Sequence, residues 1–141
     1  QPDSLKKWRY FNNFYGQFQL TNKIGLTAGF DIGVQQESKG SNVYDVWYSP
    51  ILIARYTATD KIRIGVRGEY YDDKGGVIIP TATANGFQTY SYSLNVDYLP
   101  VDNVMLRVEG RGLTSKDNIF TSNGQPSNQS YFITTSIAMS F

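Results

Sequence analysis

The chain has 141 residues, of which 13 are basic and 12 acidic, giving a formal net charge of +1. It contains no cysteine and no histidine, which excludes disulfides, thiolate chemistry, a histidine general base and histidine metal ligands. The near-neutral charge gives no electrostatic case for nucleic acid binding, and no run of 18 apolar residues offers a transmembrane helix. The 11 Tyr, 8 Phe and 13 Gly, with many Thr, Ser and Asn, predict an all-β chain with numerous turns.

Apolar and polar residues alternate with period two along seven segments, each of which we expect to form a strand. Pro50 lies within the third segment and cannot donate to a β-ladder, so a bulge or local bend is expected there. The expected strands cover residues 8–20, 24–36, 43–59, 62–72, 91–98, 104–111 and 130–141.

The connections between these segments alternate in length. Short turns at 21–23, 60–61 and 100–103 alternate with longer loops at 37–42, 73–86 and 115–129. The strands that leave the short turns begin alike, with NKIGL, DKIRI and DNVML. This pattern predicts a repeated hairpin of about 40 residues, as in an up-and-down antiparallel sheet.

Strand length and aromatic placement favour a membrane barrel over a soluble sheet. The expected strands mostly run to 11–14 residues, whereas strands of globular proteins have about 5–6 and a tilted membrane strand needs about 9–11. On the apolar face, aromatic residues gather at two levels that resemble interfacial girdles. Those toward the long loops are Tyr10, Tyr44, Tyr70, Tyr90 and Tyr131, and those toward the short turns are Phe18, Tyr56, Tyr98 and Phe141.

All six arginines and five acids of the strands occupy the opposite, polar face. An Arg that faces lipid at the midplane costs about 2–4 kcal/mol, while one that faces water costs little. We therefore expect a charged lumen wall, with long loops outside the cell and short turns in the periplasm. The expected lumen-lining residues are Arg9, Asp31, Asp45, Arg55, Arg63, Arg67, Glu69, Asp97, Arg107, Glu109 and Arg111.

Two segments, ARYTATDKIRIGVRGEYYDDKGGV and LNVDYLPVDNVMLRVEGRGLTSKDNIF, together with the aromatic C-terminus, resemble the OmpL-like β-barrel porins of Gram-negative outer membranes. The resemblance extends from Val43 to Phe120 and matches the C-terminal portion of such porins. It implies an outer-membrane barrel that acts as a passive channel without a cofactor. It also implies that Phe141 is a signal read by the outer-membrane assembly machinery.

Seven antiparallel strands cannot close on themselves without pairing the first and last in parallel, and an open edge in lipid is prohibitive. We therefore expect residues 1–141 to be a single barrel segment, part of a larger transmembrane β-barrel. Missing upstream strands, further copies or another chain would close it. Residues 1–7 form a short polar segment that does not have the pattern of a signal peptide. If the protein is exported, its signal peptide has already been removed.

Two segments could suggest a catalytic or a metal site, and each has a simpler structural interpretation. Glu69 beside Tyr71 could suggest an acid–base pair, but a lumenal network of cross-strand ion pairs is the simpler interpretation. Residues 72–76 could suggest a calcium loop, but they lack the spacing and number of oxygens, so a solvated turn is expected. Trp47 lies in the polar phase, as a lumen plug or a platform for sugars. No enzyme activity is expected.

Three functions are compatible with these patterns. The leading hypothesis is a porin that lets small polar solutes cross an outer membrane by diffusion. The first alternative is a barrel that binds or adheres to an external partner through loops 73–86 and 115–129. The second is a soluble β-barrel or sandwich that buries its Tyr/Leu/Val face and binds a small apolar ligand.

Overall fold

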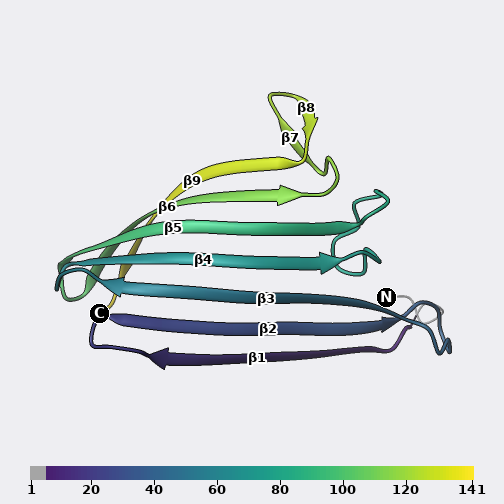
Figure 1. The fold of residues 1–141 in the computed structure, drawn as a ribbon, viewed down its shortest axis with the longest axis horizontal. Coiled ribbons are helices and arrows are strands. Elements are labelled where there is room, and N and C mark those ends of the chain that lie inside the picture. Colours follow the sequence, from purple (N-terminus) through teal and green to yellow (C-terminus); the bar gives the residue numbers. More distant parts are fainter. Residues whose placement is uncertain (1–5) are drawn as a thin grey trace.

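The computed structural model describes residues 6–141; the first five residues of the polar N-terminal segment lie outside the described residues. Seven strands form one antiparallel sheet in the order β1-β2-β3-β4-β5-β6-β9 (Figure 1). The all-β, up-and-down prediction is confirmed. Within the described residues no helix is long and apolar enough to cross a membrane. The strands are β1 (Arg9–Gln19), β2 (Ile24–Gln36), β3 (Tyr44–Thr57), β4 (Ile62–Asp73), β5 (Phe87–Val101), β6 (Val104–Ser115) and β9 (Gln129–Met139).

The register of the third strand is continuous through its proline. Pro50 pairs with Phe30 of β2 without a shift. On the β4 side the ladder passes from Tyr48 opposite Asp72 to Ile51 with the register unchanged. The expected bulge at Pro50 is therefore wrong: the missing N–H interrupts the ladder toward β4 but adds no residue to it. The only register shift recorded among the described strands lies between β5 and β6, next to their turn.

Two of the three short turns are built by the same threonine contacts. Thr21 accepts hydrogen bonds through Oγ1 from the backbone N–H groups of Lys23 and Ile24, at 3.2 and 3.0 Å. Thr59 makes the same two bonds at the same lengths in the next short turn. These contacts satisfy backbone donors that the tight turn would otherwise leave open. All three short turns lie at one end of the sheet, and the long connections lie at the other (Figure 1).

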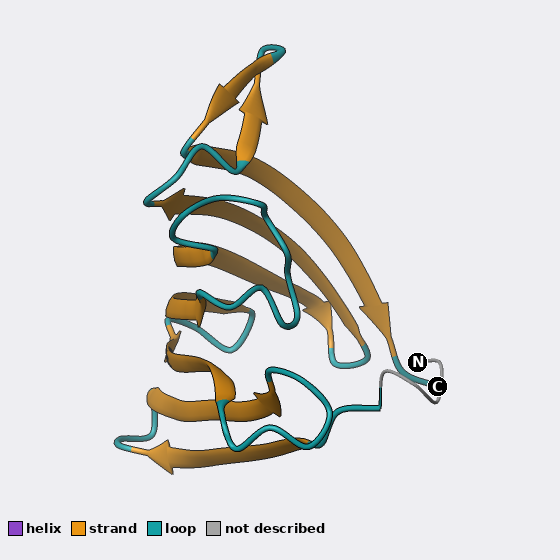
Figure 2. Cartoon of the chain, turned by 90° about the vertical axis from the view of Figure 1, so that its right-hand side faces the viewer, coloured by secondary structure: helices purple, strands orange, loops and turns teal. Residues whose placement is uncertain are grey.

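The sheet is strongly curved (Figure 2), and exposure distinguishes its two faces. Along β5, Ser91, Ser93 and Asp97 are only 5–8% exposed, whereas Tyr92 and Leu94 are 48% and 54% exposed. Side chains converge and shield one another on the inside of a curved sheet and splay apart on the outside. The polar residues therefore lie on the concave face and the apolar residues on the convex face.

This distribution is the inverse of that in a soluble protein. In residues 6–141, Trp47 is the one large apolar side chain that is buried, and it lies on the concave face. The convex face exposes Leu52, Val66, Leu94, Val108 and Ile133, among many other apolar side chains. No second layer covers this face in the described part of the chain. The hypothesis of a soluble barrel with a buried Tyr/Leu/Val face is therefore not supported.

The last long connection is not entirely irregular, contrary to expectation. It contains a small hairpin, β7 (Phe120–Ser122) and β8 (Gln125–Ser127), which projects past the edge strand β9 near its long-loop end (Figure 1). Its turn residues, Asn123 and Gly124, have φ values of 50° and 77°. Asn-Gly favours a two-residue hairpin turn because both residues tolerate positive φ. That dipeptide was the sequence signal for the hairpin.

The turn at residues 72–76, which was predicted to be solvated, is organised by a buried carboxylate. Asp73, at the end of β4, is 0% exposed and accepts hydrogen bonds at 2.8 Å from the backbone N–H groups of Val77, Ile78 and Ile79. The prediction of a solvated turn is wrong at this residue. A buried carboxylate needs donors, and three consecutive loop N–H groups supply them.

The two longest connections are also joined to each other. Asn85 donates to Asp117 from its backbone N–H and its side-chain Nδ2, both at 2.9 Å. The loop before β5 is thus tied to the connection after β6. Both belong to the end of the sheet where the long connections gather.

Candidate functional site

The concave face carries every residue expected from the sequence to line a lumen. The β-ladder registers place all eleven on one face of the sheet. Eight of them gather on four consecutive strands, β3 to β6, and three lie apart on β1 to β3. The first group is Arg55, Arg63, Arg67, Glu69, Asp97, Arg107, Glu109 and Arg111; the second is Arg9, Asp31 and Asp45.

Asp97 and Arg107 form an ion pair whose carboxylate is the most enclosed of the three paired acids, 8% exposed against 20% and 18%. The Arg107 Nε and Nη2 donate to the two carboxylate oxygens of Asp97 at 2.6 and 2.8 Å. Asn95 donates to the same carboxylate at 2.9 Å, and Arg63 lies opposite Asp97 on β4. A two-point contact of this kind fixes the guanidinium plane as well as its position.

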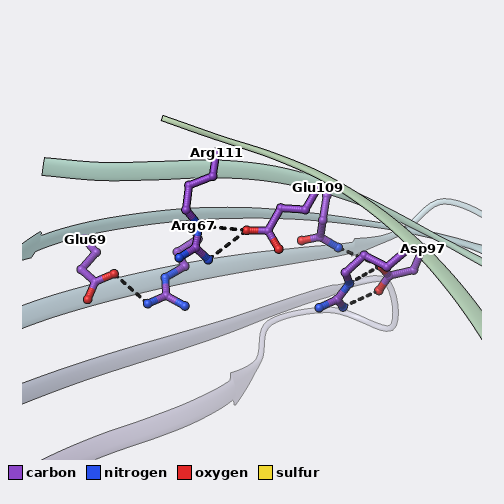
Figure 3. A network of polar contacts seen from close by, with 7 residues as sticks. Arg67, Glu69, Asp97, Glu109 and Arg111 are labelled. Atoms are coloured by element: carbon purple, nitrogen blue, oxygen red, sulfur yellow. Dashed lines mark hydrogen bonds and ion pairs between the residues drawn. The ribbon is translucent and has the colours of Figure 1, made fainter. Parts of the chain in front are cut away.

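The other two ion pairs run along a strand, not across strands. Arg67 Nη2 donates to Glu69 on β4 at 2.7 Å, and Arg111 Nη2 donates to Glu109 on β6 at 2.9 Å (Figure 3). Residues two apart on a strand share a face about 6.6 Å apart, within reach of an arginine. The expected network of cross-strand pairs is therefore wrong for these four residues. Among the described residues, the ion pair that crosses from one strand to the next is that of Asp97 and Arg107.

The arginines exceed the acids within this cluster. Five arginines face three carboxylates among these eight residues, an excess of two positive charges. Neither Arg55 nor Arg63 forms an ion pair among the described residues. A pocket of about 270 Å³ opens between the arginines over Gly65 and Asn95. A Cβ on Gly65 would overlap the Asn95 amide, so the glycine lets that side chain lie flat on the wall.

The three charged residues outside the cluster, Arg9, Asp31 and Asp45, each have different surroundings. Arg9 donates through Nε to Gln35 at 2.8 Å, and its guanidinium carbon lies 5.5 Å from the centre of the Trp47 ring. Asp31 accepts a hydrogen bond from Asn13. Asp45 lies beside the loop glycine Gly75.

Trp47 packs against the wall and neither projects from it nor presents an open ring. Its side chain is 4% exposed and lies across Gly33, where a Cβ would overlap the ring. Arg9 covers it in cation–π geometry. Neither the plug nor the sugar platform considered from the sequence matches this arrangement.

The acid–base idea for Glu69 finds no support in its contacts. Its carboxylate accepts hydrogen bonds from Arg67 and, at 3.1 Å, from the Ser49 hydroxyl. Within residues 6–141 no group of three or more acidic side chains is placed to hold a metal ion. What this face offers chemically is a fixed pattern of charge.

A family model described as "Putative beta-barrel porin-2, OmpL-like" matches residues 1–141, the whole chain. The chain belongs to this porin family. The match extends beyond the segment from Val43 to Phe120 on which the sequence resemblance rests. Comparisons with curated proteins and with solved structures found no match.

The convex face of this porin sheet carries an aromatic row near the long loops. Phe30, Tyr48, Tyr70 and Tyr90 follow one another across β2 to β5, with ring centres 6.2, 6.1 and 4.6 Å apart. Tyr70 donates its hydroxyl to Asp72 at 2.9 Å. A carboxylate avoids hydrocarbon, so Asp72 marks the polar limit of the apolar band, and the aromatic row occupies the level expected of an interfacial girdle.

Some side chains of the porin wall lie outside the set of eleven expected from the sequence. Ser93 and Asn95 are short polar residues on β5 that leave room between the longer side chains of β4 and β6. Phe11 and Tyr15 of β1 and Phe132 of β9 also lie on the concave phase and are 42–72% exposed. The period-two pattern places these aromatic residues on the concave face, but the expected set was chosen by charge and therefore did not include them.

Proposed function

We propose that this chain forms part of the wall of an outer-membrane channel through which small polar solutes diffuse. The observation that carries the proposal is the inverted sheet: a charged, hydrogen-bonded concave face and an uncovered apolar convex face. In this arrangement the convex face contacts lipid and the eleven charged residues face a water-filled lumen. Diffusion of this kind needs neither a cofactor nor a catalytic residue, and family membership supports a porin-like role.

Closure of the barrel requires strands that the sheet does not contain. β1 and β9 are its two edges, and both run from the long-loop end toward the short-turn end. Backbone groups on open edges would face lipid without partners. We therefore propose that an odd number of further strands lies between β9 and β1, so that every neighbour is antiparallel. Residues 1–141 are then one segment of a larger barrel.

Phe141 has a separate proposed role in assembly. It follows β9 on the convex phase and is fully exposed. An aromatic at this place suits recognition by the outer-membrane assembly machinery. Phe141→Ala is expected to lower the amount of folded protein in the outer membrane, measured by heat-modifiable gel mobility; an unchanged amount would remove this role.

The channel proposal is tested by reversing charge on the wall. Arg67→Glu together with Arg107→Glu changes the excess of two positive charges in the eight-residue cluster into an excess of two negative charges. The reversal potential in a planar bilayer under a KCl gradient is expected to shift toward that of a cation-selective pore. Arg55→Glu, which breaks no ion pair, is expected to shift it in the same direction by less.

The matched control is Lys61→Glu, which reverses one charge in a short turn outside the ladder. Its reversal potential should remain close to that of the unaltered protein. Conductance with identical reversal potentials in all these variants would show that the concave face does not line the pore.

The ordered long loops favour a second candidate, binding of an external partner. The tie between Asn85 and Asp117 and the projecting β7–β8 hairpin give this end a defined surface. Deletion of residues 119–128 distinguishes the two functions. A channel should keep its conductance without the hairpin, whereas a binding barrel should show no conductance before or after the deletion.

A further inference from the structure

The pocket on the concave wall has its positive charge concentrated on one row of the sheet. Arg67 on β4 and Arg111 on β6 both lie opposite Ser93 of β5. Their Cα atoms are separated by two strand spacings, about 9.5 Å. Because the serine between them is short, the two long side chains can reach toward the same space. Both of them line the pocket, whose other charged residues are Arg55, Arg107, Asp97 and Glu109.

The acids that pair with these two arginines lie away from the row. Glu69 is displaced along β4 toward the long loops, and Glu109 is displaced along β6 toward the short turns. Each carboxylate therefore binds its arginine from outside the row, and the two carboxylates lie on opposite sides of it (Figure 3). The Glu109 carboxylate still reaches the Ser93 hydroxyl, and Asp97 also lines the pocket. Four arginines therefore face two carboxylates there, which leaves an excess of two positive charges.

One donor in this space has no acceptor. The Nε of Arg67 is enclosed and has no hydrogen-bond partner among the described residues. Arg67 uses Nη2 for Glu69, and Arg55 forms neither a hydrogen bond nor an ion pair in the described part of the chain. An enclosed donor on a charged group is costly to leave unsatisfied. An acceptor with negative charge would satisfy it.

We propose that this pocket is a binding site for a small oxyanion, the carboxylate or phosphate group of a permeating solute. This inference rests on the proposed channel, because the pocket is reached from the lumen. Guanidinium groups bind planar or tetrahedral oxyanions through paired N–H donors. The volume of about 270 Å³ accommodates such a group with part of its hydration. Solutes of this class pause at the Ser93 row, so that their flux saturates with concentration.

The binding test uses inorganic phosphate as the probe with the protein in its native assembly in detergent. Phosphorus NMR should show a line of free phosphate that broadens in proportion to the protein present. Acetate added as a competitor should restore the narrow line if the site accepts any oxyanion. Restoration by chloride at equal ionic strength would reduce the effect to screening and overturn the site.

Variants locate the binding. Arg67→Gln is expected to weaken phosphate binding about tenfold, the effect of losing one charge-assisted contact. Arg55→Gln also removes a charge from the lining, but the Arg55 guanidinium lies beside Gly25, so this variant is expected to weaken binding by less. Arg55→Gln leaves no carboxylate unpaired, so it tests the site even where Arg67→Gln disturbs folding. Lys61→Gln removes one positive charge from a short turn and should leave the binding unchanged. Equal weakening in all three variants would contradict a local site.

Planar-bilayer currents separate this inference from the channel itself. Currents carried by phosphate should approach a limit as its concentration rises, and Arg55→Gln should raise the concentration at half of that limit. Currents that rise in proportion to concentration, with NMR lines that stay narrow, would overturn the oxyanion site and leave the channel intact. Phosphate broadening that depends on Arg55, in a protein without conductance, would overturn the channel and keep the site.

Discussion

At the scale of single residues, the concave wall is organised by glycines that let longer side chains lie flat. On β2, Gly25, Gly29 and Gly33 face Arg55, Ile51 and Trp47 of β3 in the register of the sheet. Each long side chain occupies space that a Cβ on its glycine would fill. These side chains therefore lie along the concave face and do not project from it, which leaves the space enclosed by the curved sheet open.

The Trp47 contact gives a direct test of this packing. Gly33→Ala should destabilise the protein by about 1–3 kcal/mol, because the new Cβ overlaps the ring and forces it from its place. The measurement is the midpoint of guanidinium unfolding in detergent. Gly68→Ala is the matched control, since a Cβ there meets nothing within 4 Å. Equal midpoints for the two variants would contradict the packing described for Trp47.

At the scale of elements, strands and loops depend on different information. The strands of the main sheet were predictable because each one separates two solvents, which imposes strict alternation along its length. β2, at Ile24–Gln36, matches its expected bounds, and β3 differs by one or two residues at each end. The shared face of the eleven residues expected to line a lumen follows from the same alternation.

Contacts made by particular side chains were not predictable in the same way. The carboxylate of Asp73 looks like part of a polar turn until the path of residues 77–79 brings their N–H groups to it. The ion-pair partner of each arginine likewise depends on its rotamer, because alternation allows an acid on the same strand or one on the next strand. The β7–β8 hairpin differs from these contacts, because the dipeptide Asn123-Gly124 alone indicates a hairpin turn.

The loop before β5 should depend on Asp73. Asp73→Asn replaces one acceptor oxygen by a donor group and should release at least one of the three backbone N–H contacts. We expect faster protease cleavage within residues 74–86 and unchanged cleavage elsewhere. Asp60→Asn, in an exposed short turn, is the control. Cleavage rates that are equal for the two variants would show that Asp73 does not hold the loop.

The tie between the two longest connections should depend on pH. Hydrogen bonds from the Asn85 side chain and backbone hold the pKa of Asp117 below its ordinary value. A lowered carboxyl pKa stabilises the tie fully above the free-carboxyl value, about 3.9, and the stabilisation is lost as pH falls through the lower folded value. Hydrogen exchange of the Asn85 amide, corrected for intrinsic pH effects, should lose protection in that acidic range.

Asp117→Asn tests the origin of this pH dependence. The amide does not titrate, so the protection of Asn85 should no longer change across the acidic range. A pH dependence that persists in the variant would assign the effect to another group.

At the scale of the whole molecule, the curved sheet has a polar inside and an apolar outside. Membership in a β-barrel porin family and the aromatic row above the apolar band agree with this arrangement. The charge of the wall is uneven, with the arginine excess in the eight-residue cluster of β3 to β6 and two further acids, Asp31 of β2 and Asp45 of β3, outside that cluster. A solute in the lumen would therefore meet a field across the pore, which suits polar solutes better than apolar ones.

The most direct test of this arrangement compares two adjacent residues of β6. The chain has no cysteine of its own, so Glu109→Cys and Val108→Cys each introduce a single thiol, the first on the concave face and the second on the convex face. In native outer membranes, a charged, water-soluble thiol reagent should modify residue 109 and spare residue 108, while a lipid-soluble reagent should modify residue 108. Modification of residue 108 by the charged reagent with residue 109 protected would contradict the account.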